Sequence, residues 1–416
     1  MNSRERVLAA INHQEPDRVP VDIGGSIVTG IMAGALTRLR RHLDMDTGPV
    51  KVYDCFQMLG EVAQDLVEKF DLDILPVEPA AIYYEFLPSR DHKPWTLFDG
   101  TPVLMPGNFD PEISPEGDWL LHEDGDPRQP VVGRMPKDGF YFDAQKVTGW
   151  KLDYTPPDID SLRNSPIWRR LTDEALRYLQ DKARTLRRAA PDKALVMTNW
   201  GEGGLGPPSV GSVAEWLVIL GSEPAYVKEL MDLAAELALD NLKLYWEAIG
   251  DDIDVIHIDG HDYGTQNREM FSPRIFKEFY APCYKVQCDW IHQRTPWKIA
   301  KHCCGSIPHL IGPMIEAGID ILNPVQTSAA GMDPQWLKDT FGDRMTFWGG
   351  GVDTQRVLPF GTPDEVYQHV AERVRIFAPG GGFIWAAVHN IQYNVPSENI
   401  AAALQAVSDC GHYPVG

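Results

Sequence analysis

The 416-residue sequence predicts an α/β protein, a (β/α)8 barrel of the TIM type that carries an inserted region of antiparallel hairpins. Three observations predict this fold: eight short apolar runs recur along the chain, helical stretches separate them, and the runs are continuously apolar. Continuous apolar strands are buried on both faces, as parallel sheets require. Alternation of eight strands with helices favours a closed barrel. An open doubly wound sheet would give the same local pattern and stays the alternative.

The predicted strands can be placed in order along the chain. They cover residues 19–22, 73–77, 194–198, 254–258, 298–302, 319–323, 345–349 and 383–388. Between them, a period of 3.6 residues predicts helices over 225–249, 273–292 and 363–377, and Thr362 is the N-cap of the last one.

One stretch breaks the alternation of strands and helices. Short strand-like pieces at 101–105, 119–122, 131–135 and 140–142 are separated by Gly, Pro and Asp, which is typical of antiparallel hairpins. We therefore predict one barrel domain over residues 1–416 with a β-hairpin insertion at about 87–154. The insertion is either a lid over the barrel mouth or a surface excursion, and the sequence favours neither.

Composition excludes several classes of protein. Lys and Arg total 38 against 59 Asp and Glu, so the formal net charge is −21. Without a basic patch the chain is not expected to bind nucleic acid or an anionic membrane surface. No apolar run approaches the roughly 20 residues of a transmembrane helix, and the first residues do not resemble a signal peptide. We expect a cytoplasmic protein whose six cysteines form no disulfide framework.

Polar residues follow nearly every predicted strand. In a barrel, the loops after the carboxyl ends of the strands carry the function. This convergence indicates an enzyme. We expect a substrate to be bound by residues of these loops, namely Asn199, Trp200, Glu202, Gln326 and Gln392.

The sharpest motif is His302-x-Cys304 at the end of the fifth predicted strand. Imidazole and thiolate are donors that zinc prefers. His389, at the end of the last strand, is the best third ligand because strand ends converge on one mouth in a closed barrel. Glu202 and Asp262 are reserve ligands, and Cys303 is an alternative to Cys304. Taken singly, a buried His or Cys is more often a packing residue.

A second constellation is Asp259-Gly-His261-Asp262 after the fourth strand. An aspartate beside a histidine can relay a proton or orient a substrate, which makes Asp262 and His261 candidate catalytic residues. The structural alternative is that this segment caps a helix, and Thr265 and Ser272 fit that role well.

Several blocks of the sequence resemble one known family. They are Asp262-Tyr-Gly-Thr-Gln266, Phe271-Ser-Pro273, His302-Cys-Cys-Gly305, the run from Gly318 to Gln326, Phe347-Trp-Gly-Gly350 and Asn399. Together they resemble the uroporphyrinogen decarboxylase superfamily over residues 250–410, with a looser match near 4–22 and 70–78. The resemblance implies a distorted (β/α)8 barrel and leaves the inserted hairpins unmatched.

Two branches of that superfamily matter here. The decarboxylases grip their polycarboxylate substrate with an arginine-bearing N-terminal motif. This sequence has Asp22-Ile-Gly-Gly-Ser26 at that place, with no Arg between Arg18 and Arg38. A highly anionic tetrapyrrole is therefore an implausible ligand for so acidic a chain. The resemblance does carry over Asp73 as a candidate catalytic aspartate, although its place in a strand also suits a structural role.

The other branch comprises cobalamin-dependent methyltransferases, such as the methylcobamide:coenzyme M enzymes, whose zinc site is His-x-Cys followed by a distant Cys. His302 and Cys304 match the first two positions, whereas His389 stands where the second Cys is expected. The resemblance implies Zn²⁺, a small methylated substrate, and a cobalamin or other corrinoid carried by a partner protein. The sequence leaves open whether the chain forms a homodimer.

Two other functions stay open. One is a carboxy-lyase of the uroporphyrinogen decarboxylase type that acts on another carboxylate without a metal. The other is a non-catalytic barrel that serves as a binding or corrinoid-docking subunit. Metal content and sensitivity to changes at Asp73 or Cys304 distinguish these from a zinc-dependent methyltransferase.

Overall fold

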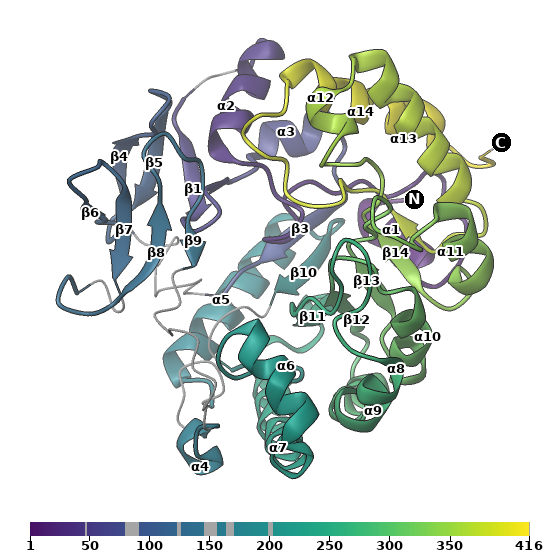
Figure 1. Ribbon diagram of the computed structural model, residues 1–416. Helices are drawn as coiled ribbons and strands as arrows, with labels where there is room; N and C mark the ends of the chain where they lie inside the picture. The colour runs from purple at the N-terminus through teal and green to yellow at the C-terminus, as the bar shows by residue number, and fades with distance from the viewer. Residues whose placement is uncertain are drawn as a thin grey trace.

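A computed structural model of the chain describes residues 1–45, 48–79, 91–122, 126–144, 156–163, 170–198 and 203–415. Within those ranges, none of the helices combines the length and the apolar character needed to cross a lipid bilayer. Parallel strands curl around a central axis with helices outside them, and a second group of strands lies to the left in Figure 1.

The barrel sheet contains seven parallel strands. They are β3 (Ile74–Val77), β10 (Ala194–Thr198), β11 (Val255–Asp259), β12 (Lys298–His302), β13 (Ile321–Asn323), β14 (Thr346–Trp348) and β15 (Phe383–Ile384). Their spatial order is β15-β14-β13-β12-β11-β10-β3, so each strand pairs with its predecessor in the barrel. Seven of the eight predicted runs therefore form strands, several of them shorter than predicted.

The remaining predicted strand, 19–22, the first along the chain, is an irregular segment that nevertheless closes the barrel. Trp385 N donates to the carbonyl oxygen of Pro20 at 2.8 Å, and Asp22 N donates to that of Trp385 at 2.9 Å. On the other edge, Asp73 N donates to the carbonyl oxygen of Val21 at 2.9 Å. Pro20 has no N–H group, which interrupts the ladder and explains why the segment is not a regular strand.

Helices surround the sheet. They are α2 (Ala33–His42), α3 (Gln64–Lys69), α4 (Ile159–Leu162), α5 (Asp173–Ala189), α6 (Val213–Ser222), α7 (Pro224–Ile249), η2 (Gly250–Asp252), α8 (Pro273–Ile275), η3 (Phe276–Tyr280), α9 (Ala281–Arg294), α10 (Pro308–Glu316), α11 (Pro334–Phe341), α12 (Val357–Phe360), α13 (Pro363–Phe377) and α14 (Ser397–Cys410). The predicted cap of α13 is present, since Thr362 and Glu365 form a reciprocal capping box.

The helix predicted over 273–292 is interrupted by a turn of π-helix, η3. Pro282 follows that turn, and a proline inside a helix removes one backbone hydrogen bond and crowds the carbonyl of the preceding turn. A π-turn accommodates both effects.

The barrel interior is mainly apolar and closed at its amino end. The apolar side chains that face inward form one cluster, namely Ile74, Ala194, Val196, Val255, Ala300, Ile321, Trp348, Ile384 and Ala386. Val7 and Ile11 of α1 (Ser3–Ile11) belong to the same cluster. Arg4 of α1 donates to Asp254, the residue before β11, at 2.7 Å, which places α1 across the amino ends of the strands.

The hairpin region forms two four-stranded sheets, ordered β2-β1-β5-β4 and β6-β7-β8-β9. Their strands are β1 (Val50–Asp54), β2 (Leu59–Gly60), β4 (His92–Thr96), β5 (Pro102–Pro106), β6 (Glu112–Ile113), β7 (Trp119–His122), β8 (Val131–Met135) and β9 (Asp143–Ala144). Three of the four predicted pieces are strands. The fourth, 140–142, is not, and β9 follows it. The sequence analysis also missed β1, which precedes β3 yet pairs in parallel with β5.

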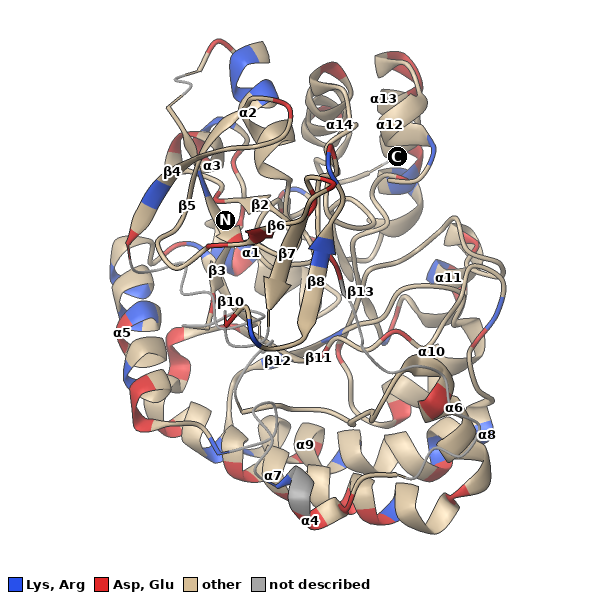
Figure 2. Cartoon of the chain, turned by 60° about the vertical axis from the view of Figure 1, so that its left-hand side comes forward, with Lys and Arg blue, Asp and Glu red and all other residues tan. Residues whose placement is uncertain are grey.

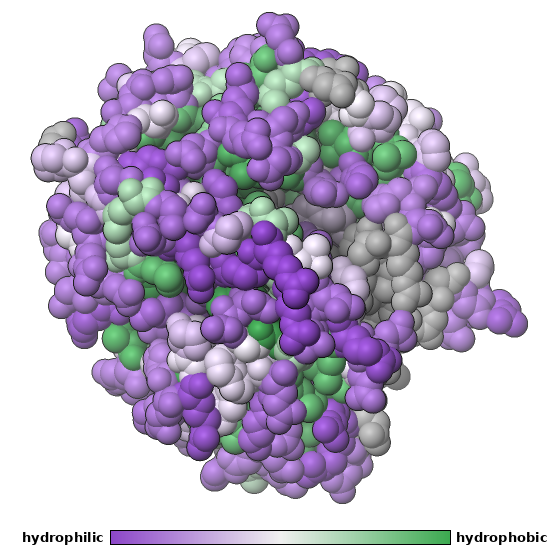
Figure 3. All heavy atoms as spheres, turned by 180° about the vertical axis from the view of Figure 1, so that it is seen from behind, coloured by the Kyte–Doolittle hydropathy of each residue, from purple (hydrophilic) through white to green (hydrophobic). Residues whose placement is uncertain are grey.

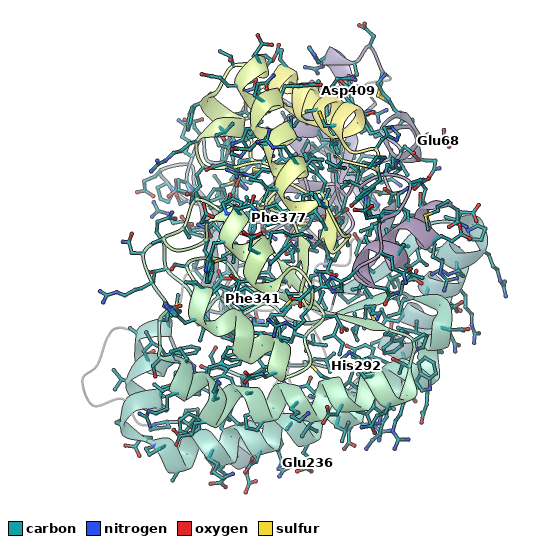
Figure 4. All side chains as sticks on the ribbon, turned by 90° about the vertical axis from the view of Figure 1, so that its right-hand side faces the viewer. Glu68, Glu236, His292, Phe341, Phe377 and Asp409 are labelled. Carbon is teal, nitrogen blue, oxygen red and sulfur yellow. The ribbon has the colours of Figure 1, made fainter. Side chains whose placement is uncertain are left out.

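The surface is largely hydrophilic. Figure 3 shows polar residues over most of one face, and Figure 2 shows acidic residues interspersed with basic ones along α5. In Figure 4, Phe377 of α13 points toward the sheet, whereas Asp409 of α14 points outward. Phe377 is fully buried against Phe347 and Phe383, so α13 seals this side of the barrel.

Candidate metal centre at the barrel mouth

Three side chains from distant parts of the sequence meet at the carboxyl end of the barrel. His302 ends β12, Cys304 lies two residues further on, and His389 follows β15. Their potential ligand atoms all lie within 4.8 Å of one another, and Cys304 Sγ is 3.3 Å from His302 Nε2. Tetrahedral zinc holds such ligands about 3.5 Å apart. Small side-chain movements would therefore let the three share one ion.

His302 is held with Nε2 directed into this cluster. Its Nδ1 lies 2.8 Å from Oδ1 of Asn323, the last residue of β13. The Nδ2 group of Asn323 donates to the carbonyl oxygen of Trp348 at 3.2 Å, which fixes the orientation of the amide. Nδ1 of His302 must therefore carry the ring proton, and the lone pair stays on Nε2. Such outer partners typically orient metal-binding histidines.

The structure distinguishes the two adjacent cysteines. Cys303 is 1% exposed, and its Sγ accepts a hydrogen bond of 3.2 Å from the backbone N–H of Tyr263. Cys304 directs its Sγ toward His302. Cys304 is therefore the cysteine of the cluster.

The loops after β11 and β12 approach each other closely beside Cys304. Gly305 has φ +93°, and a Cβ added there would lie 2.4 Å from the carbonyl carbon of Gly264. Asp262 Oδ1, in the neighbouring loop, accepts a hydrogen bond of 2.6 Å from Cys304 N. The contact between the two loops fixes the backbone that carries the thiol.

His389 is the most weakly anchored of the three. Its Nδ1 accepts a hydrogen bond of 2.8 Å from the backbone N–H of the next residue, Asn390. The ring is nearly perpendicular to that of His302, with centroids 5.4 Å apart. An ion can bind through Nδ1, or through Nε2 once the ring proton has moved to Nδ1. Either mode ends the contact with Asn390.

Electrostatics favour the neutral form of all three side chains. Burial lowers the pKa of His302 and lowers that of His389 to about 4, so both rings keep a lone pair at neutral pH. Burial, together with Asp262, raises the pKa of the Cys304 thiol far above its usual value. A thiolate forms here only when a cation replaces the proton, as happens when a metal binds. The donor set fits zinc.

Asp262, one of the two predicted acid–base residues, borders this cluster, and His261, the other, precedes it in the same loop. Asp262 Oδ1 is 3.7 Å from His302 Nε2, and its side chain is 44% exposed. His261 Nδ1 is 2.6 Å from Oδ1 of Asp259, and its Nε2 faces Ser209 Oγ at 3.4 Å. Both side chains can therefore meet a molecule at the mouth.

A recess of about 50 Å³ opens beside these two residues. Aromatic side chains line it, and Phe271 stacks on Tyr280 with centroids 4.8 Å apart. Trp216 donates from Nε1 to Tyr280 OH at 2.8 Å, which satisfies both polar groups inside the recess wall. The recess offers an apolar surface next to the polar cluster.

The predicted substrate-binding residues occupy different places in the structure. Gln326 accepts a hydrogen bond of 2.8 Å from Gly305 N and so supports the loop that carries Cys304. Gln392 donates to the carbonyl oxygen of Asn390 at 3.1 Å. Asn199, Trp200 and Glu202 lie outside the described residues.

Asp73 is not part of the cluster. It precedes β3, at the amino end of the barrel, and is fully buried. Arg6 and Arg18 each donate to it at 2.7 Å, and Val21 N donates at 2.8 Å. Its carboxylate is occupied by structural contacts, at the end of the strands opposite to His302.

A cavity of about 670 Å³ lies elsewhere, between β3, α3 and α5, and its lining includes Tyr53, Glu78 and Lys182. None of the three cluster residues lines it. Trp348 is fully buried inside the barrel, and Trp385 is 1% exposed on the other face of the barrel wall.

Comparison with known proteins identifies the family. A model of the uroporphyrinogen decarboxylase (URO-D) family matches residues 158–410, more than half of the chain. The chain belongs to the uroporphyrinogen decarboxylase family. The match covers every residue of the cluster and excludes the two additional sheets.

One solved structure agrees in fold with this URO-D family member. A methyltransferase from Methanosarcina mazei superposes with a TM-score of 0.56 at 16% identity, over 98% of this chain and 99% of that one. The homocysteine methyltransferase from Escherichia coli matches 59% of this chain and 91% of its own at 10% identity, with a TM-score of 0.22, too low to relate the folds. No curated protein sequence matches at a significant level.

Proposed function

We propose that this URO-D family member is a zinc-dependent methyltransferase or demethylase. It would move a methyl group between a small methylated substrate and a corrinoid carried by a partner protein. The observation that carries the proposal is the cluster of His302, Cys304 and His389, whose ligand atoms lie within 4.8 Å of one another at the mouth of the barrel. Three protein ligands leave a fourth zinc position for a substrate.

Bound zinc would act as a Lewis acid that stabilises charge on the substrate heteroatom. Two imidazoles and one thiolate leave the ion more positive than a site with two thiolates would, which favours an ether or amine leaving group. The chain's own residues supply the rest. The aromatic recess holds the apolar part of the substrate, and His261 or Asp262 exchanges a proton with the heteroatom.

The metal-free carboxy-lyase is the less favoured function. It depended on Asp73 as a catalytic group, and Asp73 is saturated by Arg6 and Arg18 at the far end of the barrel. The fold shared with a methyltransferase is compatible with the proposed reaction, although at 16% identity it supports the architecture alone.

Metal analysis of the purified protein after expression with added zinc tests the proposal. We expect one zinc per chain in the wild type and loss of zinc in His302→Ala and Cys304→Ser. Cys303→Ser is the matched control, because its thiol is turned away toward Tyr263, and it should keep its zinc. A wild type without zinc, or a Cys304→Ser variant that keeps it, would contradict the proposal. Mixing the zinc protein with reduced cobalamin and methylated ethers, amines or thioethers then identifies the donor class.

A further inference from the structure

Two consecutive residues of β12 face opposite sides of the barrel wall. His302 points inward to the cluster, and Lys301 points outward into a fully buried space against α9. The register of β11 against β12 shifts between His257 and Asp259. As a result, Asp259 lies on the same side as Lys301, and the two form an ion pair of 2.7 Å.

Both charged groups of the ion pair form further hydrogen bonds. Lys301 Nζ also donates to the carbonyl oxygens of His261 and His302, both at 2.8 Å, so its three protons are all used. Oδ2 of Asp259 accepts from Lys301, from Tyr263 OH at 3.0 Å, and from Tyr284 OH. A buried ion pair that lacked such partners would be costly. The wall next to the metal cluster thus contains a charged group held rigidly in place.

Oδ1, the other carboxylate oxygen of Asp259, accepts two hydrogen bonds from His261. Oδ1 of Asp259 accepts from His261 N at 3.0 Å and from His261 Nδ1 at 2.6 Å. A carboxylate oxygen can only accept, so Nδ1 must carry a proton. The lone pair of the neutral ring is then on Nε2, which lies 3.4 Å from Ser209 Oγ. The side chain is 47% exposed and lines the aromatic recess together with Asp262.

We propose that His261 is the group that exchanges a proton with the substrate heteroatom, and that Asp259 and Lys301 are positioning residues that fix its tautomer. This inference rests on the proposed function and selects His261 over Asp262. Asp262 is instead engaged by the backbone N–H of Cys304. A carboxylate that orients an imidazole in this way is a recurring arrangement in enzymes.

The proton balance is straightforward. On demethylation, the bond between the methyl carbon and the heteroatom breaks and its electron pair stays on the heteroatom. The methyl carbon is taken by the nucleophilic corrinoid of the partner protein. The heteroatom receives the proton from Nε2 of the His261 imidazolium, which becomes neutral and is protonated again from solvent. In the reverse direction, Nε2 accepts the proton of the heteroatom.

Asp259→Asn should invert the tautomer. The three donors around Oδ2 force the amide to place its oxygen there, which leaves the NH₂ group facing His261 Nδ1. Nδ1 must then accept, and the proton moves to Nε2. Tyr284→Phe is the matched control. It removes one donor from the same network but keeps the carboxylate, so the tautomer should not change.

Nitrogen-15 NMR of zinc-loaded protein with labelled histidines reports the tautomer directly. The chain has 12 histidines, and the signal that disappears in His261→Gln belongs to His261. We expect a protonated Nδ1 in the wild type and in Tyr284→Phe, and an unprotonated Nδ1 in Asp259→Asn. Methyl transfer by Asp259→Asn should fall about 10³- to 10⁴-fold with unchanged zinc content.

The outcomes separate the inference from the proposed function. A wild type without a proton on Nδ1, or an Asp259→Asn variant with unchanged tautomer and rate, overturns the inference even if zinc is bound. Absence of zinc overturns the proposed function, while the tautomer still decides the inference. If Asp259→Asn does not fold, the inference is tested by the tautomer of the wild type and by the rate of methyl transfer in His261→Gln. That variant keeps the buried ion pair, and an unchanged rate would again overturn the inference.

Discussion

His302 has both ring nitrogens committed, one to Asn323 and the other to the cluster with Cys304. The sequence predicted His302, Cys304 and His389 as ligands because residue type and strand position were enough to select them. It could not choose between Cys303 and Cys304, since that choice depends on which way the backbone turns after β12. It also gave Asn323 no role, because its contact with His302 requires the neighbouring strand in register.

The lowered pKa of His389 has a measurable consequence for stability. Burial, and then His302, lower it from 6.5 to about 4. Between these pH values the unfolded ring binds a proton and the folded ring does not. The metal-free protein should therefore lose free energy of unfolding as the pH falls from about 6.5 to about 4, by about 3 kcal/mol from this residue.

Urea unfolding of the metal-free protein at pH 7 and pH 5 checks this prediction. His389→Gln should show a weaker loss at pH 5 than the wild type does. His412→Gln, a change at an exposed histidine, is the control and should behave like the wild type. An equal pH dependence in all three proteins would show that His389 is not responsible.

At the scale of elements, the site depends on how the loops after β11 and β12 meet. Sequence periodicity predicted both strands, but not the contact between Gly264 and Gly305, which brings two backbones together without side chains between them. The sequence likewise did not predict the parallel pairing of β1 with β5. Such pairings join segments far apart in the chain, and no local pattern encodes them.

Gly305→Ala should therefore damage the site as well as the fold. The added Cβ would lie 2.4 Å from Gly264, at a backbone φ of +93° that disfavours alanine. Gly380→Ala is a matched control, because Gly380 has φ +76° but no atom within 4 Å of an added Cβ. Both variants should lose about 1–3 kcal/mol of stability from backbone strain.

Only Gly305→Ala should also lose affinity for zinc, which competition with a chelator measures. Equal zinc affinity in the two alanine variants would mean that the loop contact does not position Cys304. Thermal unfolding of both proteins confirms that the comparison is made on folded chains.

At the scale of the whole molecule, the barrel class followed from the strand count, whereas the way the barrel closes did not. Closure uses the irregular segment 19–22 and the carboxylate of Asp73, held by Arg6 from α1 and by Arg18. The family resemblance suggested a catalytic role for Asp73, and no local pattern in the sequence shows that Arg6 and Arg18 bind it. One domain over residues 1–416 with an insertion at about 87–154 stays a prediction.

Asp73→Asn should destabilise the fold and leave the metal centre intact. Removing the charge takes away the buried partner that Arg6 and Arg18 share, and only the more exposed Asp17 and Asp71 still pair with them. We expect a loss of about 3 kcal/mol in the free energy of unfolding. Asp71→Asn, at a side chain that is 66% exposed and also contacts Arg18, should cost less than about 1 kcal/mol. Loss of methyl transfer in Asp73→Asn without loss of stability would restore the catalytic role.

Helix α1 has one further consequence. Val7 and Ile11 fill the amino end of the barrel, so the cluster around His302 opens toward the carboxyl ends of the strands. On the proposed function, the small substrate and the corrinoid protein would share this entrance, so the substrate would enter before the corrinoid protein docks.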